Sequence, residues 1–328
     1  MQTEPAKFII DRMNEINLCI SIQGGIATGK SSLLNSIKKN IKKNNLCALN
    51  DLEFADSFDE HNKYLVNGVQ QNSNQRFEFL LKDYFLLLDE PLDEWRKEIY
   101  SIQTKNNINE NTEMSSILNL FYKDMSKYGF LFQINAFTSR LKNIVDQISL
   151  IKDHNKNCRI HIIAERSLRT DRLFFNNLYE NNVITQVEWD IYNNFFNLIC
   201  NEIVKKEDIM IYLRVSPEKC YERTQKRDRK EEKNNQEDTE NGDKQTGVSL
   251  DYLKELHDQH EIMINNFRLE KGKKVIDIDF EKDMDEEGID LVANNLMENI
   301  FSILKENSEE SEKNGNSGVS FLESVNFF

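Results

Sequence analysis

The sequence predicts an α/β fold, a doubly wound five-stranded parallel sheet flanked by helices on both faces. Two observations favour this fold. Short, continuous apolar runs, each typical of a strand that is buried on both faces, alternate with longer segments of helical spacing. A glycine-rich loop also joins the first apolar run directly to a helix. Because ligands of such sheets bind beyond the carboxyl ends of the strands, we expect the functional residues there.

The glycine-rich loop comprises residues 24–31 and has the full Gly-x-x-x-x-Gly-Lys-Ser pattern of a phosphate loop. Backbone N–H groups of such a loop point at phosphate oxygens, Lys30 reaches the β and γ phosphates, and the Ser31 hydroxyl can hold Mg²⁺. The alternative is a glycine-rich turn that binds nothing. The strand predicted before the loop and the helix predicted after it favour the phosphate loop. We therefore expect a nucleoside triphosphate to contact Gly24, Gly25, Ile26, Ala27, Thr28, Gly29, Lys30, Ser31 and Ser32.

The composition of the 328 residues, of which 39% are hydrophobic, is that of a soluble globular protein. The formal net charge of −14 argues against a nucleic acid polymer as partner, since affinity for a phosphate backbone comes from clustered Lys and Arg. No apolar run approaches the length of a membrane span, and the first residues resemble neither a secretory signal nor an Arg-rich transit peptide. The five cysteines lack C-x-x-C spacing. We expect a cytoplasmic rather than a mitochondrial protein, with reduced thiols and no membrane contact.

Taken in order, the apolar runs predict strands over residues 18–22, 84–88, 159–164, 209–215 and 275–278. Helical spacing predicts helices over 31–43, 113–122, 130–148, 171–180, 187–200, 250–267 and 291–304, and a further helix that Pro217 opens. The polar segments 50–76 and 233–247 are interpreted as insertions, the second of them disordered. We expect an N-terminal extension over 1–16, one domain over 17–306 and a mobile tail over 307–328.

Charged residues follow two of the predicted strands. Glu90 comes after the second strand, and Glu165 and Arg166 follow the third. Phosphoryl transfer needs a cradle for the triphosphate, a metal, a base for the attacking hydroxyl and cations over the transferred group. Glu90 can take a hydroxyl proton, Glu165 can order Mg²⁺ together with Ser31, and Arg166 can neutralise developing charge. The alternative for Glu90 is a solvated acid in a turn.

Three arginines, Arg223, Arg227 and Arg229, lie at i, i+4 and i+6 on or just past the helix after the fourth strand. This spacing can point three guanidinium groups at one polyphosphate. The alternative is a charged helix face on which the arginines form i, i+4 pairs with Glu222 and Glu231.

The order of these motifs resembles that of the deoxyribonucleoside kinases, specifically the branch that holds deoxycytidine, deoxyguanosine, deoxyadenosine and mitochondrial thymidine kinases. The resemblance covers about residues 17–267, interrupted by the two insertions. It implies the P-loop kinase fold with an arginine-rich lid, ATP as the phosphate donor, Mg²⁺, and a homodimer. The motifs that carry it are the phosphate loop, Glu90-Pro91 with Trp95, Tyr122, Phe132-Gln133, Ser139-Arg140, Glu165-Arg166-Ser167 with Asp171-Arg172, Arg223, Arg227 and Arg229 with Glu231-Glu232, and residues 251–257.

The resemblance also implies a role for individual residues, with ATP-dependent phosphorylation of the 5′-hydroxyl of a deoxyribonucleoside, in nucleotide salvage, as the reaction. Glu90 would be the general base on that hydroxyl, Arg166 would hold the hydroxyl and the phosphate, and Glu165 would serve the metal. The three arginines would form the lid over ATP, with Asp279 and Phe280 beside the adenine. The acceptor would contact Tyr122 and Glu232 at its 3′-hydroxyl, Gln133 at the base edge, and Trp95, Phe132 and Phe175 around the base.

On the same resemblance, Arg140 and Asp171 would reach the far edge of the base slot. A charge-assisted pair there would leave one donor and one acceptor for the base, and would meet a thymine methyl group with polar atoms. Ala136, one helical turn before Arg140, leaves room for a purine. We therefore expect deoxyadenosine, deoxyguanosine or deoxycytidine to be favoured over thymidine. The alternative is that Arg140 and Asp171 form an ordinary surface ion pair.

Two other functions stay open on the sequence alone. A nucleoside monophosphate kinase would need further cations for the phosphate of its acceptor, whereas the acceptor side here offers Tyr122, Gln133 and aromatic side chains. A P-loop regulatory protein would bind a nucleotide without turnover or use GTP as a switch. The Asn-Lys-x-Asp sequence with which a GTPase reads guanine does not occur in this chain.

Overall fold

The computed structural model describes residues 4–43, 83–98, 100–102, 113–154, 159–202, 204–227 and 248–313. Both predicted insertions, 50–76 and 233–247, lie outside these ranges, as do the predicted site residues Arg229 and Glu232. The domain limits given above therefore stay predictions.

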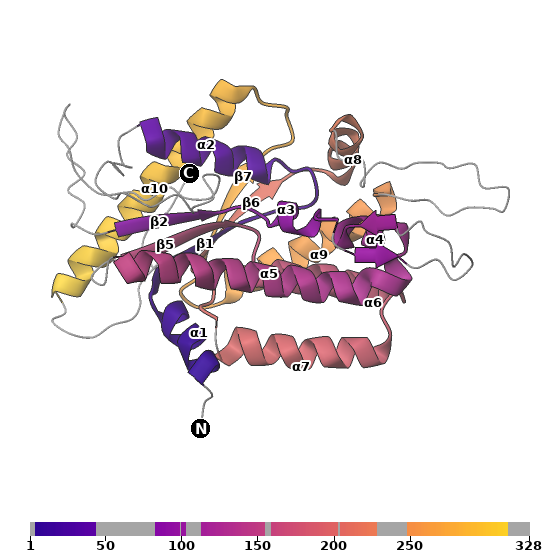
Figure 1. Cartoon of the computed structure of the whole chain (residues 1–328). Helices are drawn as coiled ribbons and strands as arrows, with labels where there is room; N and C mark the ends of the chain where they lie inside the picture. Colours follow the sequence, from indigo (N-terminus) through magenta and orange to yellow (C-terminus); the bar gives the residue numbers. More distant parts are fainter. Residues whose placement is uncertain are drawn as a thin grey trace.

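The main sheet has five strands, all parallel, in the order β2-β5-β1-β6-β7 (Figure 1). Its inner strands are apolar on both faces, and Ile20, Ile163 and Ile211 are fully buried in them. All of the predicted strands are present, and the predicted fold class is confirmed. The strands are β1 (Ile16–Gln23), β2 (Asp83–Leu88), β5 (Arg159–Glu165), β6 (Ile209–Arg214) and β7 (Lys274–Asp279).

Helices α2 (Lys30–Lys43) and α10 (Glu286–Lys313) pack together on one side of the sheet (Figure 1). The apolar stripe of α2 and the buried residues of α10, among them Leu34 and Ile300, belong to one core cluster with β1. The Asn40 side chain of α2 also donates a hydrogen bond to the Asp290 carbonyl oxygen of α10 (3.2 Å). This packing anchors α2, the helix that follows the phosphate loop.

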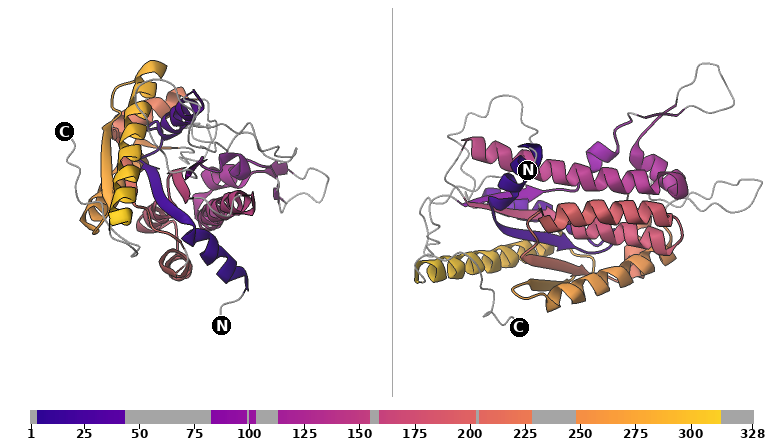
Figure 2. Two further views of the ribbon diagram at one scale, coloured as in Figure 1. Left: turned by 90° about the vertical axis from the view of Figure 1, so that its left-hand side faces the viewer. Right: turned by 90° about the horizontal axis from the view of Figure 1, so that it is seen from below.

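The other side of the sheet carries the remaining large helices (Figure 2). Aromatic rings join them, since Phe137 of α5 contacts Tyr192 of α7 with ring centroids 6.3 Å apart. Helix α6 packs on both α5 and α9, so it lies between them. These helices are α5 (Met125–His154), α6 (Leu168–Glu180), α7 (Gln186–Glu202) and α9 (Leu250–Leu269), with α1 (Glu4–Asn14) packed on α5 and the short α8 (Pro217–Lys226) beside α9.

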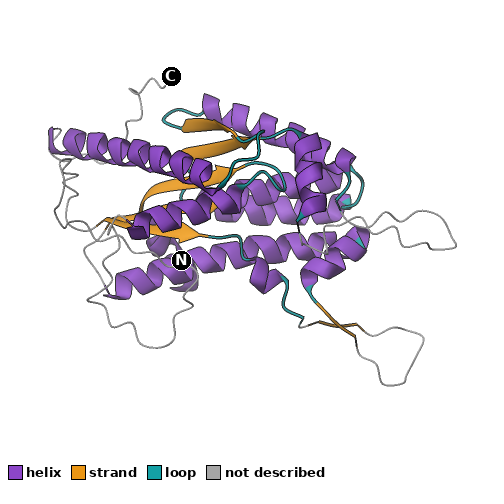
Figure 3. Ribbon diagram, turned by 90° about the horizontal axis from the view of Figure 1, so that it is seen from above, coloured by secondary structure: helices purple, strands orange, loops and turns teal. Residues whose placement is uncertain are grey.

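The prediction of one helix over 113–122 is wrong in its first part. Residues Glu113–Ser115 form strand β4, which pairs antiparallel with β3 (Tyr100–Ile102) apart from the main sheet (Figure 3). Helix α4 (Ile117–Lys123) begins after Ser116, because the Ser116 hydroxyl accepts the Asn119 N–H (3.1 Å) and caps the helix.

Three further differences concern helices. Helix α1 and the four-residue α3 (Leu92–Trp95) were not predicted, and α10 continues to Lys313, past the start of the predicted tail. Helix α8 begins with Pro217 at its first position, as predicted. No described helix combines the length and the apolar character that crossing a membrane requires.

Candidate active site

A cavity of about 550 Å³ opens at the carboxyl ends of the strands. Its walls come from the phosphate loop, the ends of β2 and β5, helices α3, α4, α5, α6, α8, α9 and α10, and the loop after β7. The predicted site residues that line it are Ile26, Ala27, Thr28, Gly29, Lys30, Ser31, Ser32, Glu90, Trp95, Tyr122, Phe132, Gln133, Ala136, Glu165, Arg166, Asp171, Arg223, Arg227 and Phe280.

The phosphate loop has the backbone that its glycines predict. Gly24 and Gly29 adopt φ of +142° and +99°, a region that favours glycine. A Cβ at Gly24 would lie 2.8 Å from the Thr28 hydroxyl and 2.9 Å from the Leu213 carbonyl oxygen, so a side chain does not fit there. The Lys30 ammonium is buried and donates hydrogen bonds to the carbonyl oxygens of Gly24 (3.0 Å) and Gly25. Burial and the nearby Arg166 charge lower the pKa of Lys30.

A hydroxyl and a carboxylate meet where a metal would be needed. The Ser31 hydroxyl donates to Glu165 Oε1 at 3.0 Å, and Glu165 is buried. Burial, together with the charge of Glu90, raises the pKa of Glu165. Two oxygen ligands of this kind fit Mg²⁺, which usually takes one or two protein oxygens and completes its shell with phosphates and water. No cluster of three or more His, Cys, Asp or Glu side chains suited to a metal occurs within the described ranges.

The two charged residues at neighbouring strand ends form a pair. Glu90 Oε1, after β2, lies 3.2 Å from Arg166 Nε, after β5, and 3.6 Å from Arg140 Nη2. The backbone of Arg166 is left-handed (φ +66°), and its N–H donates to the Ile22 carbonyl oxygen of β1 (2.9 Å). These contacts hold a carboxylate and a guanidinium beside the phosphate loop, which is the arrangement that activation of a hydroxyl for attack on a phosphate requires.

Aromatic side chains form the part of the cavity farther from the phosphate loop. The rings of Trp95 and Phe132 meet edge to face with centroids 5.4 Å apart, and the Trp95 N–H donates to the Ser139 hydroxyl (2.9 Å). The Gln133 amide is buried among them and makes no hydrogen bond to the described residues. Flat apolar walls with one buried amide suit a planar heterocycle that carries hydrogen-bonding groups at its edge.

Arg140 and Asp171 form a buried, bidentate pair. Arg140 Nε donates to Asp171 Oδ2 (3.0 Å), Nη2 donates to Oδ1 (3.2 Å), and Nη1 donates to the Glu165 carbonyl oxygen (2.9 Å). The two side chains are 6% and 5% exposed, which rules out an ordinary surface ion pair. Asp171 lines the cavity, whereas Arg140 lies behind it.

Five predicted site residues that the structure describes do not line the cavity, namely Gly24, Gly25, Arg140, Phe175 and Asp279. Phe175 is fully buried in the core, where its ring stacks on Tyr192 with centroids 3.8 Å apart, and the neighbouring Phe174 lines the cavity instead. Asp279 also points elsewhere, since its carboxylate accepts the Glu281 N–H (2.9 Å). Phe280 does line the cavity, and its ring covers the phosphate loop at Gly29.

The lid arginines that the structure describes have different surroundings. Arg223 donates to Asp283 Oδ1 (2.9 Å) and to the Phe280 carbonyl oxygen (2.8 Å), so it holds the loop after β7. Arg227 ends helix α8 and lines the cavity. The predicted alternative partner Glu222 pairs with Lys219 and Lys226 instead.

Sequence reasoning missed three aromatic residues of the cavity wall, Phe121, Phe174 and Tyr252. Phe121 precedes Tyr122, and its ring stacks on Phe132 with centroids 4.6 Å apart. Phe174 and Phe175 lie three and four residues after Asp171. Both positions fall close to the face of α6 that carries Asp171. Helical spacing therefore could not decide which of them meets the cavity.

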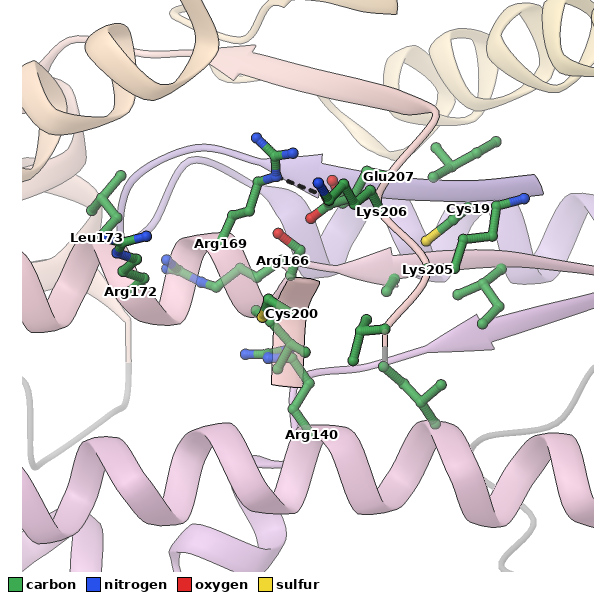
Figure 4. Close-up of a pocket in the computed structure, with 18 of the residues that line it drawn as sticks. Cys19, Arg140, Arg166, Arg169, Arg172, Leu173, Cys200, Lys205, Lys206 and Glu207 are labelled. Atoms are coloured by element: carbon green, nitrogen blue, oxygen red, sulfur yellow. Dashed lines mark ion pairs between the residues drawn. The ribbon is translucent and has the colours of Figure 1, made fainter. Parts of the chain in front are cut away.

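A second cavity, of about 410 Å³, lies between the sheet and helices α5, α6, α7 and α9 (Figure 4). Cations dominate its polar wall, and several are paired: Arg169 Nε lies 3.2 Å from Glu207 Oε2, and Lys205 Nζ lies 3.2 Å from Asp208 Oδ2. Arg166 lines both cavities. The phosphate loop and Glu90 do not line the second cavity, so the chemistry described above belongs to the first.

A phosphate loop, a glutamate and an arginine at neighbouring strand ends, and an aromatic slot are features that suit a P-loop phosphotransferase with a planar acceptor. The deoxynucleoside kinase family model matches residues 20–305, so the chain belongs to the deoxynucleoside kinase family.

Individual relatives agree with this assignment. The chain is 30% identical to a probable deoxycytidine kinase of fowlpox virus over 66% of this chain and 78% of the viral one. It is 30% identical to the mitochondrial deoxyguanosine kinase of Xenopus laevis over 70% and 74% of the two chains, and 28% identical to deoxycytidine kinase 2 of Gallus gallus over 80% and 77%. The chain is thus an enzyme that phosphorylates deoxynucleosides with ATP in nucleotide salvage. These matches argue against the alternative of a P-loop regulatory protein that binds a nucleotide without turnover.

Proposed function

We propose that this kinase transfers the γ-phosphoryl group of ATP to the 5′-hydroxyl of a deoxyribonucleoside, with Glu90 as the general base and Arg166 as its partner. The observation that carries the proposal is the position of the Glu90 and Arg166 pair in the same cavity as the phosphate loop, with 3.2 Å between Oε1 and Nε. A hydroxyl held by this pair would face the γ-phosphate on Lys30.

In the proposed mechanism Glu90 accepts the proton of the 5′-hydroxyl while the hydroxyl oxygen attacks the γ-phosphorus of ATP. The bond from the γ-phosphorus to the β–γ bridging oxygen breaks, and ADP leaves. Arg166 and Lys30 stabilise the charge on the transferred group, and Arg223 and Arg227 act from the lid. Ser31 and Glu165 would hold Mg²⁺, which neutralises phosphate charge when it is bound. Burial of Lys30, Glu165 and Arg166 strengthens their interactions, because water competes less for the charges.

We also propose that deoxycytidine and the purine deoxyribonucleosides are better substrates than thymidine. The buried Arg140 and Asp171 pair would place polar atoms where a thymine methyl group would lie. Gln133 has a donor and an acceptor available for the base edge. The names of the relatives, deoxycytidine and deoxyguanosine kinases, agree with this preference.

Two further expectations belong to the proposal. A homodimer is supported by exposed apolar side chains on the outer helices, namely Leu131 of α5 and Val187, Ile191 and Leu198 of α7. The cytoplasmic location expected from the sequence stays a prediction, which imaging of the full-length protein in its own cells tests.

Glu90→Gln tests the proposed base. We expect kcat to fall about 10²-fold or more, because the amide cannot accept the proton, while the KM for the deoxyribonucleoside stays within about threefold. Steady-state ADP release with deoxycytidine, deoxyguanosine, deoxyadenosine and thymidine measures both values. Glu94→Gln is the matched control, since Glu94 is exposed on the same segment and does not line the cavity. A Glu90→Gln enzyme with near wild-type kcat would show that another group takes the proton.

A further inference from the structure

The guanidinium group of Arg166 is held in an unusual way. Its side chain is 6% exposed, yet Nε and Nη1 have no hydrogen-bond partner among the described residues. Glu90 lies near Nε, but a single oxygen beside one nitrogen does not fix the plane of a guanidinium group. Another contact must therefore set the orientation of Arg166.

That contact is the ring of Phe174. The Arg166 Cζ atom lies 4.6 Å from the ring centroid, so the guanidinium group faces the aromatic ring. A cation over a ring face gains from the ring quadrupole, and more so when both groups are desolvated. The Phe174 ring covers one face of the guanidinium group. The N–H groups of Arg166 point outward in the guanidinium plane, so they stay available for a substrate hydroxyl or phosphate.

Phe174 is itself supported by a buried histidine. The His260 ring of α9 meets Phe174 edge to face, with centroids 6.2 Å apart at an angle of 85°. His260 Nδ1 donates to the Leu256 carbonyl oxygen (2.6 Å), which fixes the ring within α9. Burial, together with the Arg166 charge, lowers the pKa of His260 to about 3, so His260 is neutral and adds no repulsion to Arg166.

We propose that Phe174 is a positioning residue for Arg166, and that His260 holds the Phe174 ring in place behind it. The inference rests on the proposed role of Arg166 in catalysis and adds how its orientation is set. It assigns Phe174 a task in addition to lining the cavity, because one face of its ring meets Arg166.

Phe174→Leu tests the proposal, since leucine keeps the apolar bulk and lacks the ring face. We expect kcat to fall about tenfold and the KM for ATP and for the deoxyribonucleoside to stay within about threefold. Phe174→Tyr keeps the ring and should retain kcat within about threefold. Phe130→Leu is the control, because Phe130 is a half-buried phenylalanine of α5 that does not line the cavity, and it should leave both constants unchanged.

A double-mutant cycle with Arg166→Gln separates positioning from packing. If Phe174 acts through Arg166, Phe174→Leu should change kcat less than twofold in the Arg166→Gln enzyme. An equal tenfold loss in both backgrounds, or a Phe174→Leu enzyme with a raised KM and normal kcat, would overturn the inference and leave the role of Arg166 intact. A near wild-type kcat for Arg166→Gln would instead remove the proposed role of Arg166, and the inference with it.

Discussion

Charges of both signs alternate through the buried part of the active site. Glu90 lies between Arg166 and Arg140, and Arg140 in turn binds Asp171. Each charge attracts the opposite charges beside it, and this attraction offsets the free-energy cost of removing the charges from water. Removal of one side chain therefore leaves a buried charge without a partner of opposite sign. Single substitutions here should therefore cost more than the contact that they delete, and substitutions in pairs are the more informative experiments.

The first prediction at this scale concerns Lys30 and pH. Its pKa is lowered in the folded protein by burial and by Arg166, and the negative charge of a bound triphosphate would raise it again. ATP binding should therefore take up a proton, and the affinity for ATP should fall as pH rises above the lowered pKa, by at most about tenfold per pH unit. Calorimetric titration in two buffers of different ionisation enthalpy measures the proton uptake.

Lys30→Arg is the control for this titration, because a guanidinium group stays charged over the whole range. The affinity of that variant for ATP should be weaker and independent of pH between about 7 and 10. Proton release on ATP binding to the wild-type enzyme would contradict the assignment of Lys30 as the titrating group.

The second prediction concerns the Arg140 and Asp171 pair. Arg140→Met with Asp171→Ala should open the base slot, so the ratio of kcat/KM for thymidine to that for deoxycytidine should rise about tenfold or more. Absolute activity should fall, because Arg140 also lies 3.6 Å from Glu90 and donates to the Glu165 carbonyl oxygen. Either single change should mainly reduce activity or stability, since it leaves one buried charge alone. A wild-type enzyme that prefers thymidine would refute the assignment.

The sequence predicted most residues of the cavity, because motif residues at strand ends must meet at one edge of a parallel sheet. It could not distinguish Phe174 from Phe175, since both lie on the same helix face near Asp171. It also could not show that Arg140 and Asp171 are buried, because burial depends on which helices cover them. Arg229 and Glu232 lie outside the described residues, and their roles stay predictions.

At the scale of elements, the strands were predicted to within a few residues because buried parallel strands are continuous apolar runs. The prediction over 113–122 failed at a cap: the Ser116 hydroxyl starts α4, and the residues before it pair with β3 instead. The spacing of apolar residues could not reveal the boundary between β4 and α4. Strands β3 and β4 form a short two-stranded sheet, and such short strands show little alternation of apolar and polar residues.

Helix α10 should be required for stability of the phosphate loop, because it packs on α2. Ile300→Ala should lower the free energy of unfolding by about 2–5 kcal/mol, since Ile300 is fully buried in the cluster shared with α2 and β1. Leu291→Ala is the control on the same helix, because Leu291 is 61% exposed, and it should change stability by less than about 0.5 kcal/mol. Urea denaturation followed by circular dichroism measures both. Equal losses would show that α10 is not anchored as described.

For the whole molecule, the order of the strands explains why distant motifs meet. Strand β5 lies between β1 and β2, so the phosphate loop, the Glu165-Arg166 pair and Glu90 come from three adjacent strand ends. The sequence predicted the strands and their parallel direction but gave no order, because pairing between strands far apart in the chain leaves no local pattern. Which of these side chains lie close together therefore follows only from the order of the strands.

The outer helices α5 and α7 present an apolar surface that a single chain leaves exposed. Val187, Ile191 and Leu198 of α7 are 67%, 53% and 59% exposed and recur at i, i+4 and i+11, which places them along one helix face. The opposite face of α7 packs Tyr192 and Phe196 on Phe137 of α5. An exposed apolar stripe of this kind marks an interaction surface, and a symmetric dimer is the commonest assembly that covers it.

We therefore expect wild-type enzyme to sediment at about twice the 38.7 kDa mass of the chain, and Ile191→Glu with Leu198→Glu to sediment at the mass of one chain. The reason is that two glutamates would be buried without partners at the interface of each protomer. Leu269→Glu is the control, because Leu269 is 85% exposed at the end of α9 and does not belong to the α7 stripe, and it should leave the mass unchanged. Sedimentation equilibrium measures the mass, and circular dichroism confirms that each variant is folded. A wild-type monomer at micromolar concentration, or a folded double variant that stays dimeric, would place the interface elsewhere or exclude it.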